Sequence, residues 1–509
     1  MTRRCEGRRP RDDEAAVGAS TPWRDVALAA VGLGCYVATL LLYSETITPF
    51  QRFAGTESFV GDFAPLALAL SSLVAVGVLV AAWRGLFVPR RALLVGGGVL
   101  YVVSCVAFAI ATLTGLPGPV GVAPAMAAAL AVMTAVGSVA LALAWGRVYK
   151  GLTPRRSLVA VALAGLVACV LGLVLTVLPG PACVVLFGVI ALAAAVLPAV
   201  VGVRAPSGDA QAVSHGSATD AAAGPASIAP RSLSERLRSF LDVAAPAFLG
   251  LLAFAFIMGT MRELIVEAHP IHIATMAFVA VVLLALGLRS GRRPLARLAE
   301  RSLIPVLAVT LLAVSNVTAA LWGGAAIDMV MIYLLYTLAA TLTLASLSAM
   351  AHAGEFSSDA IFATAVALFS LASYAGLKTA EFVTPEQIKA LTAVVTTIYA
   401  FAMVLLPGLL TGRNHRTDDA EVPADEASSL TAPALPTRDE RCAELAEQCG
   451  LTAREAEVLA ILAKGHSSGY ISEVLYISPN TVRTHMHNIY RKLGVSSRED
   501  ILLLVRDPR

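Results

Sequence analysis

Charged residues are scarce in this chain. Asp, Glu, Lys and Arg make up 14% of its 509 residues, whereas a soluble globular protein carries about 25%. Apolar residues rise to 57% of the total. This composition excludes an ordinary soluble globular protein, because so much apolar surface needs a solvent other than water. We therefore expect an integral membrane protein.

The chain also lacks the motifs of common metal and catalytic sites. Its seven cysteines are scattered, without a Cys-x-x-Cys pair or a Cys/His spacing suited to zinc, and its eight histidines show no metal-binding spacing. The sequence contains no phosphate-binding loop, no kinase or hydrolase motif and no acidic receiver-like domain. We therefore expect neither an enzyme nor a bound cofactor or metal.

Long apolar runs are abundant instead. A helix that crosses the hydrocarbon core needs about 20 mostly apolar residues, and twelve segments meet this need, in two sets of six. The first six lie within residues 25–203 and the second six within 242–411; a polar stretch, 204–241, separates them. The predicted segments are 25–43, 63–83, 92–113, 121–145, 157–178, 182–203, 243–261, 271–288, 303–322, 326–349, 357–377 and 389–411. Together they predict an all-α, polytopic bundle of six plus six helices.

The distribution of basic residues predicts the orientation of this bundle. If residues 1–24 are cytoplasmic, the loops on that side contain 24 Lys and Arg residues, and the loops on the other side contain four. Cytoplasmic loops carry such an excess. An even number of crossings then leaves both termini in the cytoplasm, and the predicted location is the cytoplasmic membrane, with its lipid as a partner. The inside loop near 350–356 contains no Lys or Arg, so charge does not support the two helices beside it.

A separate domain is predicted at the C-terminal end. Residues 412–440 are polar and rich in Pro, Ala, Asp and Glu, which predicts a flexible linker, and residues 441–509 form a cytoplasmic domain. Local signals in this domain predict four short helices. The caps expected for them are, in chain order, a Thr452–Glu455 capping box, Ser467 or Ser468, Ser478 ahead of Pro479, and a Ser496–Glu499 capping box.

The third of these helices, from about Pro479 to Leu493, has two contrasting faces. Arg483, His487 and Arg491 follow one another at a spacing of four, and no acidic residue occurs from Val474 to Arg498. The apolar residues Val482, Met486, Ile489 and Leu493 form the other face, which we expect to be buried. A helix with locally unopposed positive charge suits the DNA major groove. A charged face that is merely solvated is the alternative interpretation.

The stretch LTAREAEVLAILAKGHSSGYISEVLYISPNTVRTHMHNIYRKLGVSSRED resembles the LuxR/GerE-type helix-turn-helix of bacterial transcription regulators. The second predicted helix departs from the family pattern, because Ser468-Gly469-Tyr470-Ile471-Ser472 stands where a polar residue, Lys or Arg, Glu, Ile and Ala are usual. The matching residues are Leu451-Thr452, Arg454-Glu455, Glu457-Val458-Leu459, Gly465, Ile471, Leu475, Ser478, Thr481-Val482, His485, Ile489-Tyr490, Lys492-Leu493-Gly494-Val495 and Ser497-Arg498.

The resemblance implies a DNA-binding domain of four helices in which the third helix reads the bases. It implies that Arg483, Thr484 and His487 approach base edges. It also implies a homodimer through the fourth helix, near Arg498 to Val505, on an operator with two half-sites. The residues implied to lie nearer the phosphates are Lys464, Ser478, Asn480, Thr481, Arg491 and Lys492.

The membrane module resembles the major facilitator architecture in its two sets of six helices and its long central loop. Its loops at 83–91 and 287–294 lack the acidic residue of the Gly…Asp…Gly-Arg pattern usual in transporters. Few charges fall within the membrane helices, where they are costly and usually functional. Asp328, Arg262 and Glu263 are the candidates for a ligand-sensing site, and a position at the membrane interface is the alternative.

Together these observations predict a membrane-bound one-component transcriptional regulator. In this hypothesis the membrane module senses an unknown small molecule or a membrane signal and controls DNA binding by the C-terminal domain. One alternative is a transporter with a fused regulatory DNA-binding domain. Another is a structural anchor whose helix-turn-helix binds protein.

Overall fold

The computed structural model describes residues 22–40, 57–86, 88–114, 122–202, 233–261, 269–289, 325–411, 438–495 and 497–506. Within these ranges every regular element is a helix, as the sequence predicts. The chain divides into two compact units. One unit contains Thr21–Ser232 and Ala244–Leu405, and the other includes Leu406–Arg509.

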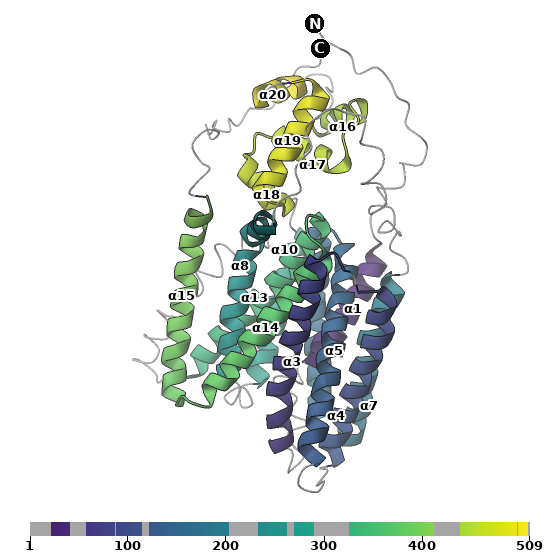
Figure 1. Ribbon diagram of the computed structural model, residues 1–509, viewed down its shortest axis with the longest axis vertical. Helices are drawn as coiled ribbons and strands as arrows, with labels where there is room; N and C mark the ends of the chain where they lie inside the picture. Colours follow the sequence, from purple (N-terminus) through teal and green to yellow (C-terminus); the bar gives the residue numbers. More distant parts are fainter. Residues whose placement is uncertain are drawn as a thin grey trace. The chain divides into compact units, whose positions relative to one another are not determined.

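Ten helical segments of the described chain are long and apolar enough to cross a membrane. The protein is therefore a multi-pass membrane protein. The predicted run 303–322 lies outside the described residues, and every other predicted run coincides with a helix. In chain order these helices (Figure 1) are α1 (Trp23–Leu40), α3 (Glu57–Trp83), η3 (Ala92–Gly97) continued by α4 (Gly98–Thr114), α5 (Val122–Lys150), α6 (Pro154–Val177), α7 (Gly180–Gly202), α8 (Leu233–Thr260), α10 (His269–Arg289), α13 (Ala325–Ala353), α14 (Ser358–Ala380) and α15 (Pro385–Thr411). The last of these, α15, is not among the ten segments.

The helix ends differ from the predicted boundaries for a physical reason. Helix α8 begins at Leu233, inside the predicted linker 204–241, and α5 continues to Lys150 rather than residue 145. Hydropathy marks the part of a helix that lies in hydrocarbon, whereas polar residues such as Glu235 and Arg236 extend the same helix into water. The two helices beside the loop near 350–356, which charge did not support, are present as α13 and α14.

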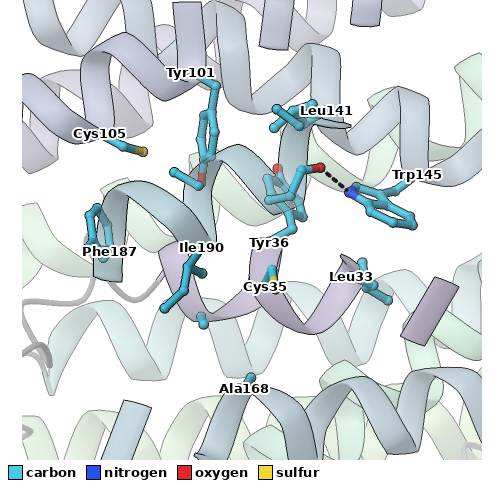
Figure 2. Close-up of a cluster of buried hydrophobic side chains, with 14 of the residues drawn as sticks. Leu33, Cys35, Tyr36, Tyr101, Cys105, Leu141, Trp145, Ala168, Phe187 and Ile190 are labelled. Atoms are coloured by element: carbon cyan, nitrogen blue, oxygen red, sulfur yellow. Dashed lines mark hydrogen bonds between the residues drawn. The ribbon is translucent and has the colours of Figure 1, made fainter. Parts of the chain in front are cut away.

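The first six helices share an aromatic-rich core. Figure 2 shows Tyr36 of α1, Tyr101 of α4 and Trp145 of α5 in this core. The hydroxyl of Tyr36 donates to the carbonyl of Ser138 at 2.8 Å, and the indole N–H of Trp145 donates to the carbonyl of Ala194 at 3.2 Å. These two buried polar groups thus have partners, as a hydrocarbon environment without water requires.

The later helices form a second core and meet the first six along two seams. Phe254 of α8, Leu342 of α13 and Tyr399 of α15 belong to this second core. At the seams α3 packs along α14, and α6 packs along α10. Helix α5 also touches α14 closely, because a Cβ on Gly146 would lie 2.3 Å from Cδ2 of Phe362. Glycine is therefore required where these two helices cross.

The C-terminal unit contains five short helices with a core of their own. They are α16 (Arg438–Gln448), α17 (Ala453–Leu462), α18 (Ser468–Leu475), α19 (Pro479–Leu493) and α20 (Arg498–Arg506). The last four are the helices that the sequence predicts. Helix α16 precedes them, starts within the predicted linker 412–440, and packs against α17 and α20. The side chains that fill this core include Leu445, Leu459, Leu462, Ile471, Val482, Ile489 and Ile501.

Candidate nucleic-acid interface

Side-chain caps define where the helices of the C-terminal unit begin. At α17 the backbone N–H of Thr452 donates to Glu455 Oε2 at 2.8 Å, and Thr452 Oγ1 accepts from the N–H of Glu455 at 3.3 Å. This confirms the predicted capping box. Ser467 caps α18, and Ser478 caps α19 with Pro479 at the first helical position. Both caps were also predicted from the sequence.

The cap of α20 differs from the prediction. Ser497, not Ser496, opens the helix: its backbone N–H donates to Asp500 Oδ2 at 3.0 Å, and its hydroxyl accepts from the N–H of Asp500 at 3.1 Å. The predicted Ser496–Glu499 box is therefore wrong by one residue. Ile501 and Val505, four residues apart on α20, are both buried.

The two faces of α19 lie as the sequence predicts. Val482 and Ile489 are fully buried, whereas Met486 and Leu493 lie half-buried at the edge of the apolar face. Arg483, His487 and Arg491 are exposed on the other face. Thr484, the third candidate for a base contact, is half-buried and donates its hydroxyl hydrogen to the carbonyl of Asn480 at 3.0 Å. Its hydroxyl oxygen keeps the ability to accept a hydrogen bond.

The candidates for phosphate contacts fall into two groups. Lys464, Asn480 and Arg491 are exposed, and Thr481 is half-buried in the first turn of α19. Ser478 is 1% exposed, and its hydroxyl accepts from the N–H of Thr481 at 3.2 Å. Its side chain is enclosed by the cap that it forms, so we leave it out of the interface proposed below.

Lys492 makes an internal contact that the resemblance did not imply. Its ammonium donates to Glu455 Oε2 at 2.6 Å and to the carbonyl of Gly450 at 3.0 Å. The carboxylate of Glu455 is buried, with 5% of the side chain exposed. Burial raises the pKa of Glu455, but hydrogen bonds from Lys492 and Thr452 outweigh it and hold the pKa below its usual value. The pair ties the last turn of α19 to the first turn of α17.

Two arginines also bond to carbonyls at helix ends. Arg454 of α17 donates to the carbonyl of Leu475 at 2.7 Å, at the end of α18. Arg498 of α20 donates to the carbonyl of Gly465, just beyond the end of α17. These bonds hold neighbouring helices together. By contrast, neither Arg483 nor Arg491 has an acidic partner among the described residues, so their charge is available to a ligand.

An aromatic pair links the segment before α18 to that helix. The rings of His466 and Tyr470 are stacked, with centroids 4.0 Å apart and 21° between their planes. Burial, together with the nearby positive charges of Lys464 and Arg498, lowers the pKa of His466. The imidazole is therefore more readily neutral in the folded protein than in an unfolded chain.

Comparison with known proteins identifies this fold. The family described as "Bacterial regulatory proteins, luxR family" matches residues 450–505. Residues 450–505 are a LuxR-type helix-turn-helix domain. The regulator NarL of Mycobacterium tuberculosis, described as probable, is 52% identical over 48 residues, which are 9% of this chain and 22% of that protein. The HTH-type transcriptional regulator MalT of Yersinia enterocolitica is 38% identical over 71 residues, 14% of this chain and 7% of that protein. The match thus spans only a small part of either relative.

The LuxR-type domain keeps its geometry at the position where its sequence is unusual. Gly469 is exposed in the first turn of α18, and a Cβ there would touch only Ser467 Oγ, at 3.8 Å. Helix α18 forms despite the poor helix propensity of glycine. On α20, Leu503 is 64% exposed, opposite the buried Ile501 and Val505. This outward apolar side chain lies on the helix through which the resemblance implies a dimer.

The membrane helices resemble a solved transporter. A crystal structure described as a bacterial homologue of the iron transporter ferroportin, in the outward-facing state, superposes with a TM-score of 0.52. The match covers 77% of this chain and 100% of that chain, at 13% sequence identity. At this identity the likeness shows the fold alone, which is transporter-like.

The residues proposed for ligand sensing are not placed by the structure. Arg262 and Glu263 lie outside the described residues, and Asp328 lies in the first turn of α13, where side chains are not described. An aromatic cluster lies on the described parts of α10 and α13. His272 of α10 is buried and stacked on Tyr333 of α13, with ring centroids 4.9 Å apart, and Tyr336 lies 6.2 Å away. The position of His272 near Arg262 and Glu263 was visible in the sequence, but its stacking between helices was not.

Proposed function

We propose that this protein is a membrane-bound one-component transcriptional regulator. The observation that carries the proposal is the exposed face of α19, where Arg483, His487 and Arg491 face outward with no acidic side chain nearby in the sequence. It belongs to a LuxR-type domain in the same chain as a multi-pass membrane module. The proposal contains no catalytic step, cofactor or metal.

In this proposal Arg483, Thr484 and His487 read base edges in the major groove, and Lys464, Asn480, Thr481 and Arg491 contact phosphates. The first turn of α19 adds backbone N–H groups that suit a phosphate. The LuxR-type domain has no large excess of positive charge, so one copy should bind weakly. We propose a homodimer through α20, with Leu503 in the contact, because two copies on two half-sites gain affinity from both.

The proposed orientation follows from the basic residues at one end of the membrane helices. Arg84, Arg90, Arg155 and Arg289 lie at helix ends that the chain places on one side. The positive-inside rule puts this side, and both termini, in the cytoplasm of a cell whose cytoplasmic membrane holds the protein. DNA is then accessible to the LuxR-type domain. A protease added to sealed inside-out vesicles should cleave in 412–440, whereas right-side-out vesicles should protect this segment.

The experiment that tests DNA reading uses the full-length protein in lipid nanodiscs and a pool of random DNA duplexes. Repeated capture should enrich a sequence with two half-sites. The Arg483→Ala/His487→Ala variant should enrich none, and a control, Arg438→Ala on α16, should enrich the parent sequence. Equal enrichment by parent and Arg483→Ala/His487→Ala would contradict the proposal. The double substitution removes contacts worth about 1–3 kcal/mol each.

We propose that the signal enters from the outer side through the second set of helices. Asp328, Arg262 and Glu263 remain the proposed sensing residues, because Asp328 falls within a predicted span, where a charge is costly unless functional, and the other two lie in the predicted outer loop after the seventh span. The aromatic cluster of His272, Tyr333 and Tyr336 lies between α10 and α13, and α13 is the helix that contains Asp328. Asp328→Asn should alter the response of DNA occupancy to growth conditions without altering DNA binding by the purified protein.

A transporter with a fused regulatory domain is the second candidate function, and the transporter-like fold favours it. It predicts solute flux through the purified protein in proteoliposomes. Flux that survives Arg483→Ala/His487→Ala would show that the module transports independently of DNA binding. Absence of flux over a broad panel of solutes and ions would exclude the transporter and leave the one-component regulator as the remaining candidate.

A further inference from the structure

The two sets of membrane helices are joined at one end by an ion pair whose carboxylate is buried and whose guanidinium is partly exposed. The guanidinium of Arg147, in the last turn of α5, donates from Nε to Asp359 Oδ1 at 2.8 Å and from Nη2 to Asp359 Oδ2 at 2.6 Å. Asp359 lies in the first turn of α14, and 4% of its side chain is exposed. Arg147 Nη2 also donates to the carbonyl of Val88 at 2.8 Å. One guanidinium therefore binds α14 and the segment that follows α3.

Three further hydrogen bonds join the two sets of helices at the same end. Arg155 of α6 donates to the carbonyls of Gly287 and Leu288 at the end of α10, at 2.9 and 2.6 Å. The ring Nδ1 of His352, at the end of α13, pairs with the carbonyl of Lys150 at 2.9 Å. Because these bonds use backbone carbonyls, substitution of an acidic side chain leaves them intact. Among the four side-chain contacts named here, the Arg147–Asp359 pair is the one that depends on a charge in each set.

The chemistry of this pair favours two discrete states. Asp359 gains from the N-terminus of α14 and Arg147 from the C-terminus of α5, since each charge opposes the helix dipole that it faces. With the carboxylate nearly enclosed, separating the two charges leaves one of them poorly solvated, which is strongly unfavourable. The helices are therefore either joined at this end or separated far enough for water to enter. Such a contact responds to a signal by switching rather than by gradual deformation.

The chain connects this contact to the LuxR-type domain. Helix α14 leads through residues 381–384 to α15, and residues 412–437 alone separate α15 from α16. Along the chain, α15 is thus the one membrane helix between α14 and the LuxR-type domain. We propose that the Arg147–Asp359 pair is a conformational switch: its opening or closing sets how much DNA the LuxR-type domain occupies. The inference rests on the function proposed above and names its point of regulation.

The experiment compares four variants of the full-length protein in lipid nanodiscs with the parent. Asp359→Asn and Arg147→Gln each remove one charge, and Arg147→Asp/Asp359→Arg exchanges the two. Glu381→Gln is the matched control, since it breaks the exposed pair of Lys378 and Glu381 at the other end of α14. Hydrogen–deuterium exchange at 145–152 and 357–366 reports whether the contact opens. Retention of DNA fragments selected by the parent, per folded protein, reports the output.

The switch predicts that both single variants exchange faster in these two segments and change DNA retention in the same direction, by about fivefold or more. The charge-swapped variant Arg147→Asp/Asp359→Arg should lie between the single variants and the parent, because its ion pair is restored but each charge now interacts unfavourably with its helix dipole. Glu381→Gln should match the parent. Faster exchange with unchanged DNA retention would overturn the coupling. Unchanged exchange would overturn the role of the pair as a switch. A parent that retains no selected DNA overturns the proposed function itself, and the coupling with it.

Discussion

The ammonium of Lys492 and the buried carboxylate of Glu455 form a 2.6 Å ion pair between the end of α19 and the start of α17. The same ammonium binds the carbonyl of Gly450. A residue that the family resemblance assigns to the DNA backbone thus has a structural contact within the domain. The contact joins α19, the helix that carries Arg483 and His487, to α17.

Removing the ammonium should destabilise the domain. Lys492→Met leaves the Glu455 carboxylate buried without its cation, which we expect to cost about 2–3 kcal/mol of the free energy of unfolding. Urea unfolding of a 438–509 fragment, which contains the whole five-helix core, measures the change. The control is Lys464→Met at an exposed site, where we expect about 0.5 kcal/mol or less. Equal effects of the two substitutions would show that the pair contributes little.

Arg491 and Lys492 are neighbours in sequence but should differ in their contribution to phosphate binding. Arg491 is exposed without an acidic partner among the described residues, whereas Lys492 is bound to Glu455. Arg491→Ala should reduce the slope of log affinity against log salt by about 1. Lys492→Met should leave that slope unchanged under conditions where the variant is folded. If Lys492→Met reduced this slope as much as Arg491→Ala does, Lys492 would also be a phosphate contact.

Acid should weaken the domain through Glu455. Its pKa in the folded domain is below the usual value, so the ionised form contributes stability that is fully present above the unfolded-state pKa of about 4.3. This contribution is lost as the pH falls from there through the folded-state pKa. Glu455→Gln should therefore be less stable than the parent at pH 7, and the difference should shrink in acid. Urea unfolding between pH 7 and pH 3 measures both curves; parallel curves would contradict the assignment.

The unusual glycine of α18 should be replaceable. Gly469→Ala adds a methyl group that meets only Ser467 Oγ, at 3.8 Å, and should stabilise the domain by about 0.5–1 kcal/mol through better helix propensity. Gly494→Ala is the opposing control, because Gly494 ends α19 with φ at +68°, a conformation that costs an alanine about 1 kcal/mol. Stability changes of the same sign in the two variants would contradict this account of α18.

The sequence predicts most of the fold because the signals that determine it are local. Apolar runs of span length locate the membrane helices, and the Thr452–Glu455 box locates the start of α17. The start of α20 could not be predicted as well, since Ser496 with Glu499 and Ser497 with Asp500 fit the same pattern. The hydrogen bonds between Ser497 and Asp500 in the structure distinguish these two positions.

The contacts that local patterns miss are those between distant residues. Lys492 and Glu455 are 37 residues apart, and Arg147 and Asp359 are 212 residues apart. In the sequence Lys492 resembles any cation near a DNA-reading helix. Arg147 resembles any cation in a cytoplasmic loop, and nothing near Asp359 indicates its partner. Exposure along α19 was predictable, because helical periodicity alone places Arg483, His487 and Arg491 on one face.

The most direct test of the account is genome-wide capture of DNA cross-linked to the full-length protein in living cells. The parent is compared with Arg483→Ala/His487→Ala, with both proteins at equal amounts in the membrane fraction. The account predicts discrete peaks that share a two-half-site sequence and disappear in the variant. Peaks that persist unchanged in the variant, or a purified parent that captures no preferred sequence from random DNA, would contradict a membrane-bound regulator that reads DNA through α19.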